Sequence, residues 1–367
     1  MKTIGLITIN DNMNLGNRLQ NYASYIILSK YGHTTNIVRY YSCERFVHNN
    51  KAKILLKNLR VYLRLLNCLS NPFLSKRKKY LYQREYNFFL FNKRINNGMR
   101  LDKNTDYEKL QNSFDYFVVG SDQIWNPYFF KYGMEINMLG FVKDKSKKIS
   151  MASSISCEKL LENQITDFRN FLPNFQKISC REQQGSDLIK EITGLDCETL
   201  IDPTLMLTKK QWEEVMKIPK IHPNRPFILL YVLGELTPEY KRIITNTSKK
   251  YNCEIVNIFD YDSPYYGCGP SEFIYLISTA KYVITDSFHG TVFSCIFDKK
   301  FKVLIRKDNV ISMNSRFSNI ITKLGIEGNV FVDEGTDVIT FYNNRYDKKK
   351  LEYEQEKFIS YLDTFFA

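Results

Sequence analysis

The chain has 367 residues, is 44% hydrophobic and carries a formal net charge of +13. It contains no uncharged apolar run of 18 residues, which argues against a transmembrane helix, and residues 1–8 lack the longer apolar core of a signal peptide. Its eight cysteines are scattered without a Cys-x-x-Cys pair. A zinc site and a disulfide framework are therefore poorly supported, and a reducing cytoplasm fits best.

The first half of the chain alternates short apolar runs with helical segments. We predict strands at 3–8, 36–40, 114–120, 149–152, 177–180 and 199–201, and helices at 18–30 and 158–171. A polar loop at 9–17 follows the first strand, but it lacks the three glycines of a dinucleotide-binding fingerprint. Such a loop is still the usual substrate-facing position of a Rossmann-like domain.

Positive charge concentrates in a helical insertion at about 51–97. Between Lys51 and Arg84 there are ten Lys or Arg and no Asp or Glu. Four cations share one helical stripe, and leucines cover much of the remaining surface; the four are Lys53, Lys57, Arg60 and Arg64. A helix of this kind at 53–69 suits an anionic membrane surface, although a helix packed on its domain with a solvated edge has the same pattern. Because no recognised nucleic-acid-binding module surrounds the patch, we expect no nucleic-acid partner.

Two apolar strands end in dense polar clusters. The strand at 114–120 leads into Ser-Asp-Gln-Ile-Trp-Asn-Pro, where Trp125 either stacks on a sugar or fills a corner of the core. The strand at 282–285 leads into Asp286, Ser287 and His289, and a helix starts close to His289. Since a helix N-terminus at a strand end favours anions, we expect a phosphate-bearing substrate there.

The second half repeats the alternation after a charged stretch with three prolines at 207–226, which we interpret as a linker. Strands are predicted at 227–233, 254–258, 282–285, 302–305 and 329–332, and helices at 238–250, 271–280 and 315–324. The predicted fold class is α/β, with two Rossmann-like domains facing a cleft. The first spans 1–206 and the second 227–345, and a last helix within 346–367 is expected to pack back on the first domain.

Five segments together resemble the polysaccharide pyruvyl transferase family. They are Asn14-Leu-Gly-Asn-Arg-Leu-Gln20, Val119-Gly-Ser-Asp-Gln-Ile-Trp-Asn-Pro127, Cys180-Arg-Glu182, Leu200-Ile-Asp-Pro-Thr-Leu205 and Ile284-Thr-Asp-Ser-Phe-His-Gly290. The resemblance runs in family order over nearly the whole chain. It implies a fold similar to the B-type glycosyltransferases, and transfer of a pyruvyl group from phosphoenolpyruvate to two hydroxyls of a sugar in a surface-polysaccharide precursor.

The resemblance also implies partners, and the scattered cysteines together with the basic helix indicate a location. Phosphoenolpyruvate is expected as co-substrate, with no other cofactor and no metal. The sugar acceptor is expected to be lipid-linked or nucleotide-linked. The expected location is the cytoplasm, with peripheral binding at the inner face of the membrane through the helix at 53–69.

Roles for individual residues follow from the same resemblance. His289 is the expected acid or phosphate ligand, and Asp122 the expected base toward a sugar hydroxyl. The donor-binding residues are expected to be Asn14, Asn17, Arg181, Ser287, Arg306 and Arg316, and the acceptor-binding residues Gln123, Trp125 and Asn126. Ordinary structural roles remain open as well: His289 can cap or pack against its helix, and Arg181 and Asp122 can form an ion pair or cap a turn.

The chain departs from the family pattern at one point. The family motif Arg-Leu-His is replaced by Ser287, Phe288 and His289, so that one cation of the expected donor clamp is missing. Arg306 and Arg316 follow downstream, and either can replace it in space.

Two other functions remain open from the sequence. A glycosyltransferase of the same fold would use a nucleotide-sugar donor, with its diphosphate at the 286–290 loop. A non-catalytic protein that binds sugars or anions would need the same polar loops.

Overall fold

A computed structural model describes residues 1–11, 13–39, 51–101, 104–128, 134–157, 159–305, 314–326, 330–332, 335–343 and 346–367. Five parallel strands form the first sheet; in spatial order they are β3 (Met99–Leu101), β2 (His33–Arg39), β1 (Thr3–Ile7), β4 (Tyr116–Val119) and β5 (Lys148–Ser150). Two short parallel strands, β6 (Ser179–Cys180) and β7 (Glu198–Thr199), adjoin it through bridges from Ile149 to Lys177 and from Ser153 to Cys180.

Four parallel strands form the second sheet. In spatial order they are β11 (Lys300–Val303), β10 (Tyr282–Thr285), β8 (Phe227–Tyr231) and β9 (Glu254–Asn257). Every residue of the two central strands is buried, as expected where helices cover both faces of a parallel sheet. The predicted α/β class is confirmed by these sheets.

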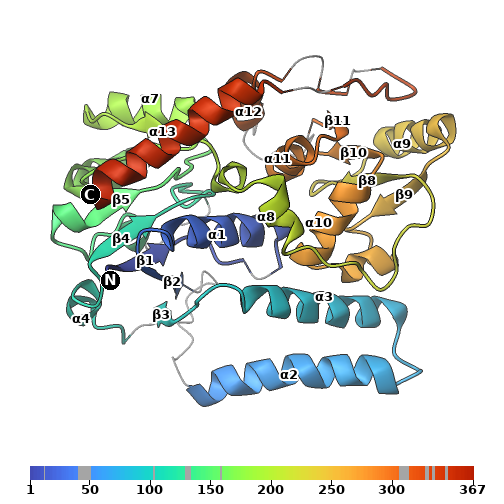
Figure 1. The fold of residues 1–367 in the computed structure, drawn as a ribbon, viewed down its shortest axis with the longest axis horizontal. Coiled ribbons are helices and arrows are strands. Elements are labelled where there is room, and N and C mark those ends of the chain that lie inside the picture. The colour runs from blue at the N-terminus through green and yellow to red at the C-terminus, as the bar shows by residue number, and fades with distance from the viewer. Residues whose placement is uncertain are drawn as a thin grey trace.

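Helices connect the strands of both sheets (Figure 1). The α-helices are α1 (Leu15–Leu28), α2 (Lys51–Ser70), α3 (Lys76–Asn92), α4 (Tyr107–Gln111), α5 (Met134–Asn137), α6 (Glu162–Phe171), α7 (Gln183–Thr193), α8 (Lys209–Glu213), α9 (Pro238–Tyr251), α10 (Pro270–Thr279), α11 (Phe288–Ile296), α12 (Asn314–Leu324) and α13 (Lys348–Phe366). Short 3-10 helices are η1 (Lys145–Lys147), η2 (Leu172–Asn174), η3 (Pro203–Met206) and η4 (Pro264–Gly267).

The basic insertion forms two antiparallel helices. Residues 71–75 separate α2 from α3, and Pro72 among them cannot continue a helix interior. In Figure 1, α2 is the outermost helix and α3 lies between it and the rest of the molecule. The buried Arg84 of α3 donates from Nη1 to the carbonyls of Tyr266 (3.2 Å) and Cys268 (3.0 Å), so the insertion is tied to the second half of the chain. Within the described part of the chain, no helix is long and apolar enough to cross a membrane.

The last helix, α13, runs along the first sheet and ends beside the N-terminus (Figure 1). The Tyr361 hydroxyl donates to the carbonyl of Ser150 at 2.7 Å, and Lys357 donates from Nζ to the carbonyl of Thr199 at 3.1 Å. The domain boundaries remain a prediction, and the segment at 207–226 contains one short helix, α8.

One apolar cluster joins the two halves. Trp212 of α8 packs against Phe293 of α11, with ring centroids 4.9 Å apart, and against Tyr22 of α1 at 5.9 Å. Burial of such large aromatic side chains contributes strongly to stability. The cluster therefore fixes α1 beside α11.

Candidate active site

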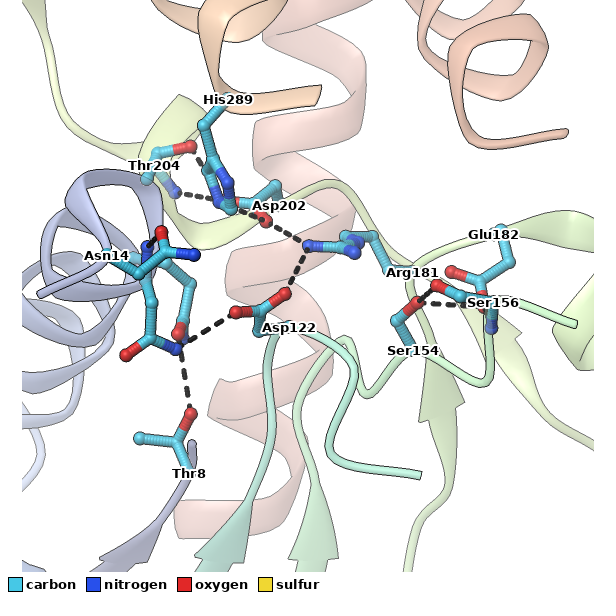
Figure 2. Close-up of polar contacts among 12 residues, drawn as sticks. Thr8, Asn14, Asp122, Ser154, Ser156, Arg181, Glu182, Asp202, Thr204 and His289 are labelled. Carbon is cyan, nitrogen blue, oxygen red and sulfur yellow. Dashed lines mark hydrogen bonds and ion pairs between the residues drawn. The ribbon is translucent and has the colours of Figure 1, made fainter. Parts of the chain in front are cut away.

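Segments that follow five different strands, three of them loops and two of them helix starts, meet at one place (Figure 2). They bring together one amide, two carboxylates, one guanidinium and one imidazole, which belong to Asn17, Asp122, Asp202, Arg181 and His289. The preceding strands are β1, β4, β7, β6 and β10. The carboxyl ends of parallel strands lie at the same edge of a sheet. Residues that are far apart in the sequence but directly follow such strands therefore lie close together.

Arg181 and Asp202 form the central ion pair. Nη1 of Arg181 donates to Oδ2 of Asp202 at 2.8 Å, and Oδ1 of Asp122 lies 3.9 Å from the same nitrogen. Burial lowers the pKa of Arg181, but Asp202 and Asp122 outweigh that effect and raise it. For Asp202, burial alone would raise the pKa. Contacts with His289 and Arg181 outweigh this effect and hold the pKa of Asp202 well below its usual range. Both groups are therefore charged at neutral pH.

Arg181 also carries donors that the protein leaves unused. Its side chain is 2% exposed, and among the described residues neither Nε nor Nη2 has a hydrogen-bond partner. The guanidinium lies over the ring of Phe288, with the Cζ atom 4.5 Å from the centroid. A buried donor without a partner costs about 1–3 kcal/mol, and a guanidinium fork matches a carboxylate or a phosphate. The arrangement thus favours binding of an anion beside His289.

His289 is the second residue of α11. Its Nε2 lies 3.7 Å from Oδ2 of Asp202, which is too long for a hydrogen bond but within ion-pair range. In the part of the chain that the structure describes, Nε2 has no hydrogen-bond partner. The other side of the ring faces Gly16, where a Cβ would stand 2.4 Å from Nδ1. The imidazole is therefore held between Asp202 and the first turn of α1.

Asn17 fixes the second carboxylate. Its Nδ2 donates to Oδ2 of Asp122 at 2.9 Å, and its Oδ1 accepts from Nη2 of Arg18 at 2.9 Å. Asp122 itself has a left-handed backbone, with φ of 56°, which is an uncommon conformation that clusters at functional sites. Asn14 has a structural role in addition, because its Oδ1 caps α1 by accepting from the Asn17 N–H at 3.0 Å. This cap explains why α1 begins at Leu15 and not at residue 18 as predicted.

The start of α11 is anchored to the second sheet. Both carboxylate oxygens of Asp286 accept backbone N–H groups at 2.7 Å, from Leu233 and from Gly234. Ser287 interacts with the hydroxyl of Tyr231, which also accepts the Gly16 N–H at 3.2 Å. Burial raises the pKa of Tyr231 to about 12, so its hydroxyl stays protonated.

Glu182 organises the neighbouring loop and was not predicted as a site residue. Its Oε1 accepts from Ser154 Oγ (3.1 Å) and from the N–H groups of Ile155 (2.8 Å) and Ser156 (2.9 Å), as Figure 2 shows in part. The Ser154 N–H in turn donates to the Asp122 carbonyl at 2.8 Å. Glu182 therefore supports the backbone that carries Asp122.

The predicted stacking platform requires a correction. Trp125 is fully buried, donates from Nε1 to the carbonyl of Asn137 at 3.0 Å, and packs edge-on against two phenylalanines, Phe168 and Phe175. It fills the core, so a sugar cannot stack on it. Gln123 and Asn126 are buried too, at 9% and 5% exposure, and their binding role remains a prediction.

Asp202 is the main residue that sequence reasoning left out of the site. The signal was present, because Asp202 lies in one of the five segments that carry the family resemblance and follows a strand directly. Its Oδ1 also caps η3 by accepting from the Thr204 N–H at 2.9 Å. Of the two arginines expected to replace the missing cation, Arg306 lies outside the described residues, and so does the side chain of Arg316. In the described part of the chain, no group of three or more His, Cys, Asp or Glu is placed to hold a metal ion.

Comparison with known proteins gives one sequence match. A family model described as Polysaccharide pyruvyl transferase matches residues 14–307. Comparison with curated protein sequences finds no match.

Comparison of this chain with solved structures gives distant matches. One is a UDP-N-acetylglucosamine 2-epimerase from Rickettsia bellii, at 8% identity and a TM-score of 0.45, covering 100% of this chain and 97% of that one. Another is the UDP-GlcNAc 2-epimerase from Methanocaldococcus jannaschii in complex with UDP-GlcNAc and UDP, at 12% identity and a TM-score of 0.43, covering 98% of this chain and 100% of that one.

Proposed function

Because the chain belongs to the polysaccharide pyruvyl transferase family, we propose that it transfers a pyruvyl group from phosphoenolpyruvate to two hydroxyls of a sugar. The product is a cyclic pyruvate ketal on a precursor of a surface polysaccharide. The observation that carries the proposal is the buried guanidinium of Arg181, which keeps two unpaired donors beside His289 and between two carboxylates.

Arg181 is proposed to bind the donor. The free Nε and Nη2 can form a bidentate pair with the carboxylate of phosphoenolpyruvate, while Asp202 holds Nη1. The first N–H groups of α11 are available to the phosphate, since the first turn of a helix leaves its amides without intrahelical partners. Donor binding would thus use one residue from the first half of the chain and one helix end from the second.

His289 is the proposed acid. It protonates the methylene carbon of phosphoenolpyruvate, which leaves an oxocarbenium-like centre on the neighbouring carbon. Asp202 lies where its negative charge stabilises an imidazolium before the transfer. Because Nε2 has no hydrogen-bond partner among the described residues, its proton is free to point at a substrate.

Asp122 is the proposed base. One sugar hydroxyl attacks the electron-poor carbon and gives its proton to Asp122, forming the first carbon–oxygen bond. A second hydroxyl then attacks the same carbon and the bond to phosphate breaks, so that phosphate leaves with the second proton. Asn17 holds Asp122 through a 2.9 Å hydrogen bond and orients it for this step.

The acceptor is proposed to be lipid-linked or nucleotide-linked, and the enzyme to act at the inner face of the membrane. Exposed apolar side chains on α2 support the contact with lipid: Leu59 (49%), Leu63 (53%) and Leu66 (58%). Arg60 and Arg64 are exposed on the same helix and would attract anionic headgroups. The side chains of Lys53 and Lys57 lie outside the described residues.

Donor screening on purified protein tests the proposal. Phosphoenolpyruvate at 100 times its dissociation constant should raise Tm by at least about 3 °C. Phosphate should be released only when a panel of lipid-linked and nucleotide-linked sugars is added as acceptor. Stabilisation by nucleotide-sugars as donors, and none by phosphoenolpyruvate, would refute the proposed donor.

A further inference from the structure

A cavity lies between α2, α3 and the loop after β1, and His289 is not among its lining residues. Its volume is about 930 Å³, which is sufficient for a large organic ligand. Part of its wall is apolar and comes from β2, α2 and α3; these residues include Val38, Leu56, Val61, Phe88 and Phe89. We call it the α2–α3 cavity.

The same cavity carries an excess of positive charge. Its lining contains Arg60, Arg64, Lys93 and Arg100 but a single carboxylate, Glu85. Arg64 pairs with Glu85 at 2.7 Å, whereas Arg60 forms no ion pair with any described residue. Lys93 lies over the ring of Phe89, with Nζ 4.6 Å from the centroid, so an apolar wall and a cation stand side by side. A ligand that fits both features is an anion with an apolar chain.

Arg18 connects the α2–α3 cavity to the candidate active site. Its side chain is 1% exposed, lines the cavity, and has an Nε atom that finds no hydrogen-bond partner among the described residues. Burial lowers the pKa of Arg18 to about 10, with Asp11 and Asp122 opposing the shift, so the group stays cationic at neutral pH. Nη2 of Arg18 donates to Oδ1 of Asn17 at 2.9 Å, and Asn17 donates to Asp122. Two hydrogen bonds therefore separate the cavity wall from the proposed base.

The cavity is also continuous with the outer face of α2. Leu56 lines the cavity and is 54% exposed, and Leu59 and Leu63 extend the apolar surface along the helix. A chain that rests on this surface can enter the cavity beside Leu56, where Arg60 and Arg64 line the same cavity and would meet its phosphate.

We propose that the α2–α3 cavity binds the phosphate and the first part of the apolar chain of a lipid-linked sugar, and so presents that sugar to Asp122. The inference rests on the proposed function for the identity of the sugar as acceptor. The apolar chain lies against Val61 and Phe88, and Arg60, Arg64 and Lys93 neutralise the phosphate. The sugar then extends past Arg18 toward the active site.

Titration calorimetry with farnesyl phosphate, used below its aggregation threshold, tests this binding directly. Wild type should bind farnesyl phosphate at least about tenfold more tightly than inorganic pyrophosphate or farnesol. Pyrophosphate lacks the apolar chain, and farnesol lacks the phosphate. The double variant Arg60→Gln with Arg64→Gln should bind at least about tenfold more weakly. Lys76→Gln with Lys78→Gln removes the same charge from exposed positions of α3 outside the cavity and should bind as wild type does.

A second variant, Val61→Trp, fills the cavity without altering charge and should also abolish binding. Far-UV circular dichroism confirms folding of each variant. Equal binding by all variants, or equal binding of pyrophosphate and farnesyl phosphate, would overturn the proposal. Tighter binding of a nucleotide-sugar that displaces farnesyl phosphate would also overturn it. Since no turnover and no phosphoenolpyruvate are involved, this result is independent of the Tm test of the proposed donor.

Discussion

Gly16 and His289 lie so close that a Cβ atom added at position 16 would stand 2.4 Å from Nδ1 and 2.6 Å from Cγ of the imidazole. Gly16 belongs to the first turn of α1, whereas His289 belongs to the first turn of α11. The two halves of the chain therefore meet at the proposed acid, and the absence of a side chain at Gly16 sets the position of the ring.

Gly16→Ala should displace His289 and lower turnover by about 100-fold, since an active-site displacement of about 1 Å has an effect of this size. The rate of phosphate release from phosphoenolpyruvate measures the loss. Gly267→Ala is the matched control, because a Cβ there meets the flexible side chain of Gln83 at 3.3 Å and the carbonyl oxygen of Tyr80 at 3.5 Å, an ordinary contact distance. A Gly16→Ala protein with wild-type turnover would show that the contact does not position the acid.

Arg181→Lys should abolish the rise in Tm that phosphoenolpyruvate produces. Lysine keeps the charge near Asp202 but lacks the planar fork that the proposed carboxylate contact uses. Differential scanning fluorimetry with and without phosphoenolpyruvate provides the measurement. Arg242→Lys changes an exposed ion pair with Asp337 and serves as the control, with an unchanged response to the donor. An undiminished Tm shift in Arg181→Lys would exclude the fork as donor ligand.

Asp202→Asn should destabilise the protein in a pH-dependent manner. At pH 7 the expected loss is about 3–5 kcal/mol, because Arg181 remains as a buried charge without its main partner. The pKa of Asp202 is depressed in the folded state. Its stabilising contribution is therefore complete above the unfolded-state pKa of about 3.9 and declines as the pH falls below that value.

Urea unfolding of wild type and Asp202→Asn between pH 7 and pH 3 measures this dependence. The difference in unfolding free energy should be constant from pH 7 to about pH 5 and shrink below about pH 4. Asp196→Asn, at an exposed ion pair with Lys190, should differ little from wild type throughout. If the difference in unfolding free energy grew on acidification, it would contradict a depressed pKa of Asp202 in the folded state.

Replacing the basic stripe of α2 should remove binding to anionic vesicles. Each lysine or arginine near such a surface contributes about 1 kcal/mol, so changing Lys53, Lys57, Arg60 and Arg64 to Gln should lower the bound fraction more than tenfold in a flotation assay. The control variant changes four exposed lysines elsewhere to Gln and therefore has the same net charge as the α2 variant. These lysines are Lys241, Lys249, Lys250 and Lys348. Loss of flotation in both variants would indicate an effect of net charge alone. Loss in neither variant would indicate that α2 only packs on the protein and does not bind the vesicle surface.

The sequence was sufficient to predict the α/β class and most strands. Apolar runs that end in polar residues marked β1, β4, β8 and β10 correctly, because strands buried on both faces have continuous apolar sequences. The prediction missed α7 altogether, and the expected helix at 158–171 begins only at Glu162. Helix starts depend on caps, and Asn14 shows how one polar side chain moves a boundary by three residues.

For the site, the sequence predicted which loops converge but not which atoms pair. His289, Arg181, Asp122 and Asn17 meet as the strand-end rule suggested, although their catalytic roles remain proposals. Trp125 was misread because a tryptophan beside polar residues has the same local sequence whether it faces solvent or the core. Its burial is decided by Phe168 and Phe175, which lie more than forty positions away in the chain.

The most direct test of the proposed mechanism is the rate at which His289→Ala releases phosphate from phosphoenolpyruvate with the best acceptor of the panel. We expect a decrease of at least about 100-fold, because a positioned general acid contributes that much or more. Circular dichroism and the unfolding temperature should stay close to those of wild type, since His289 has no short hydrogen bond to lose. A folded His289→Ala protein that turns over at nearly the wild-type rate would contradict the assignment of His289 as the acid.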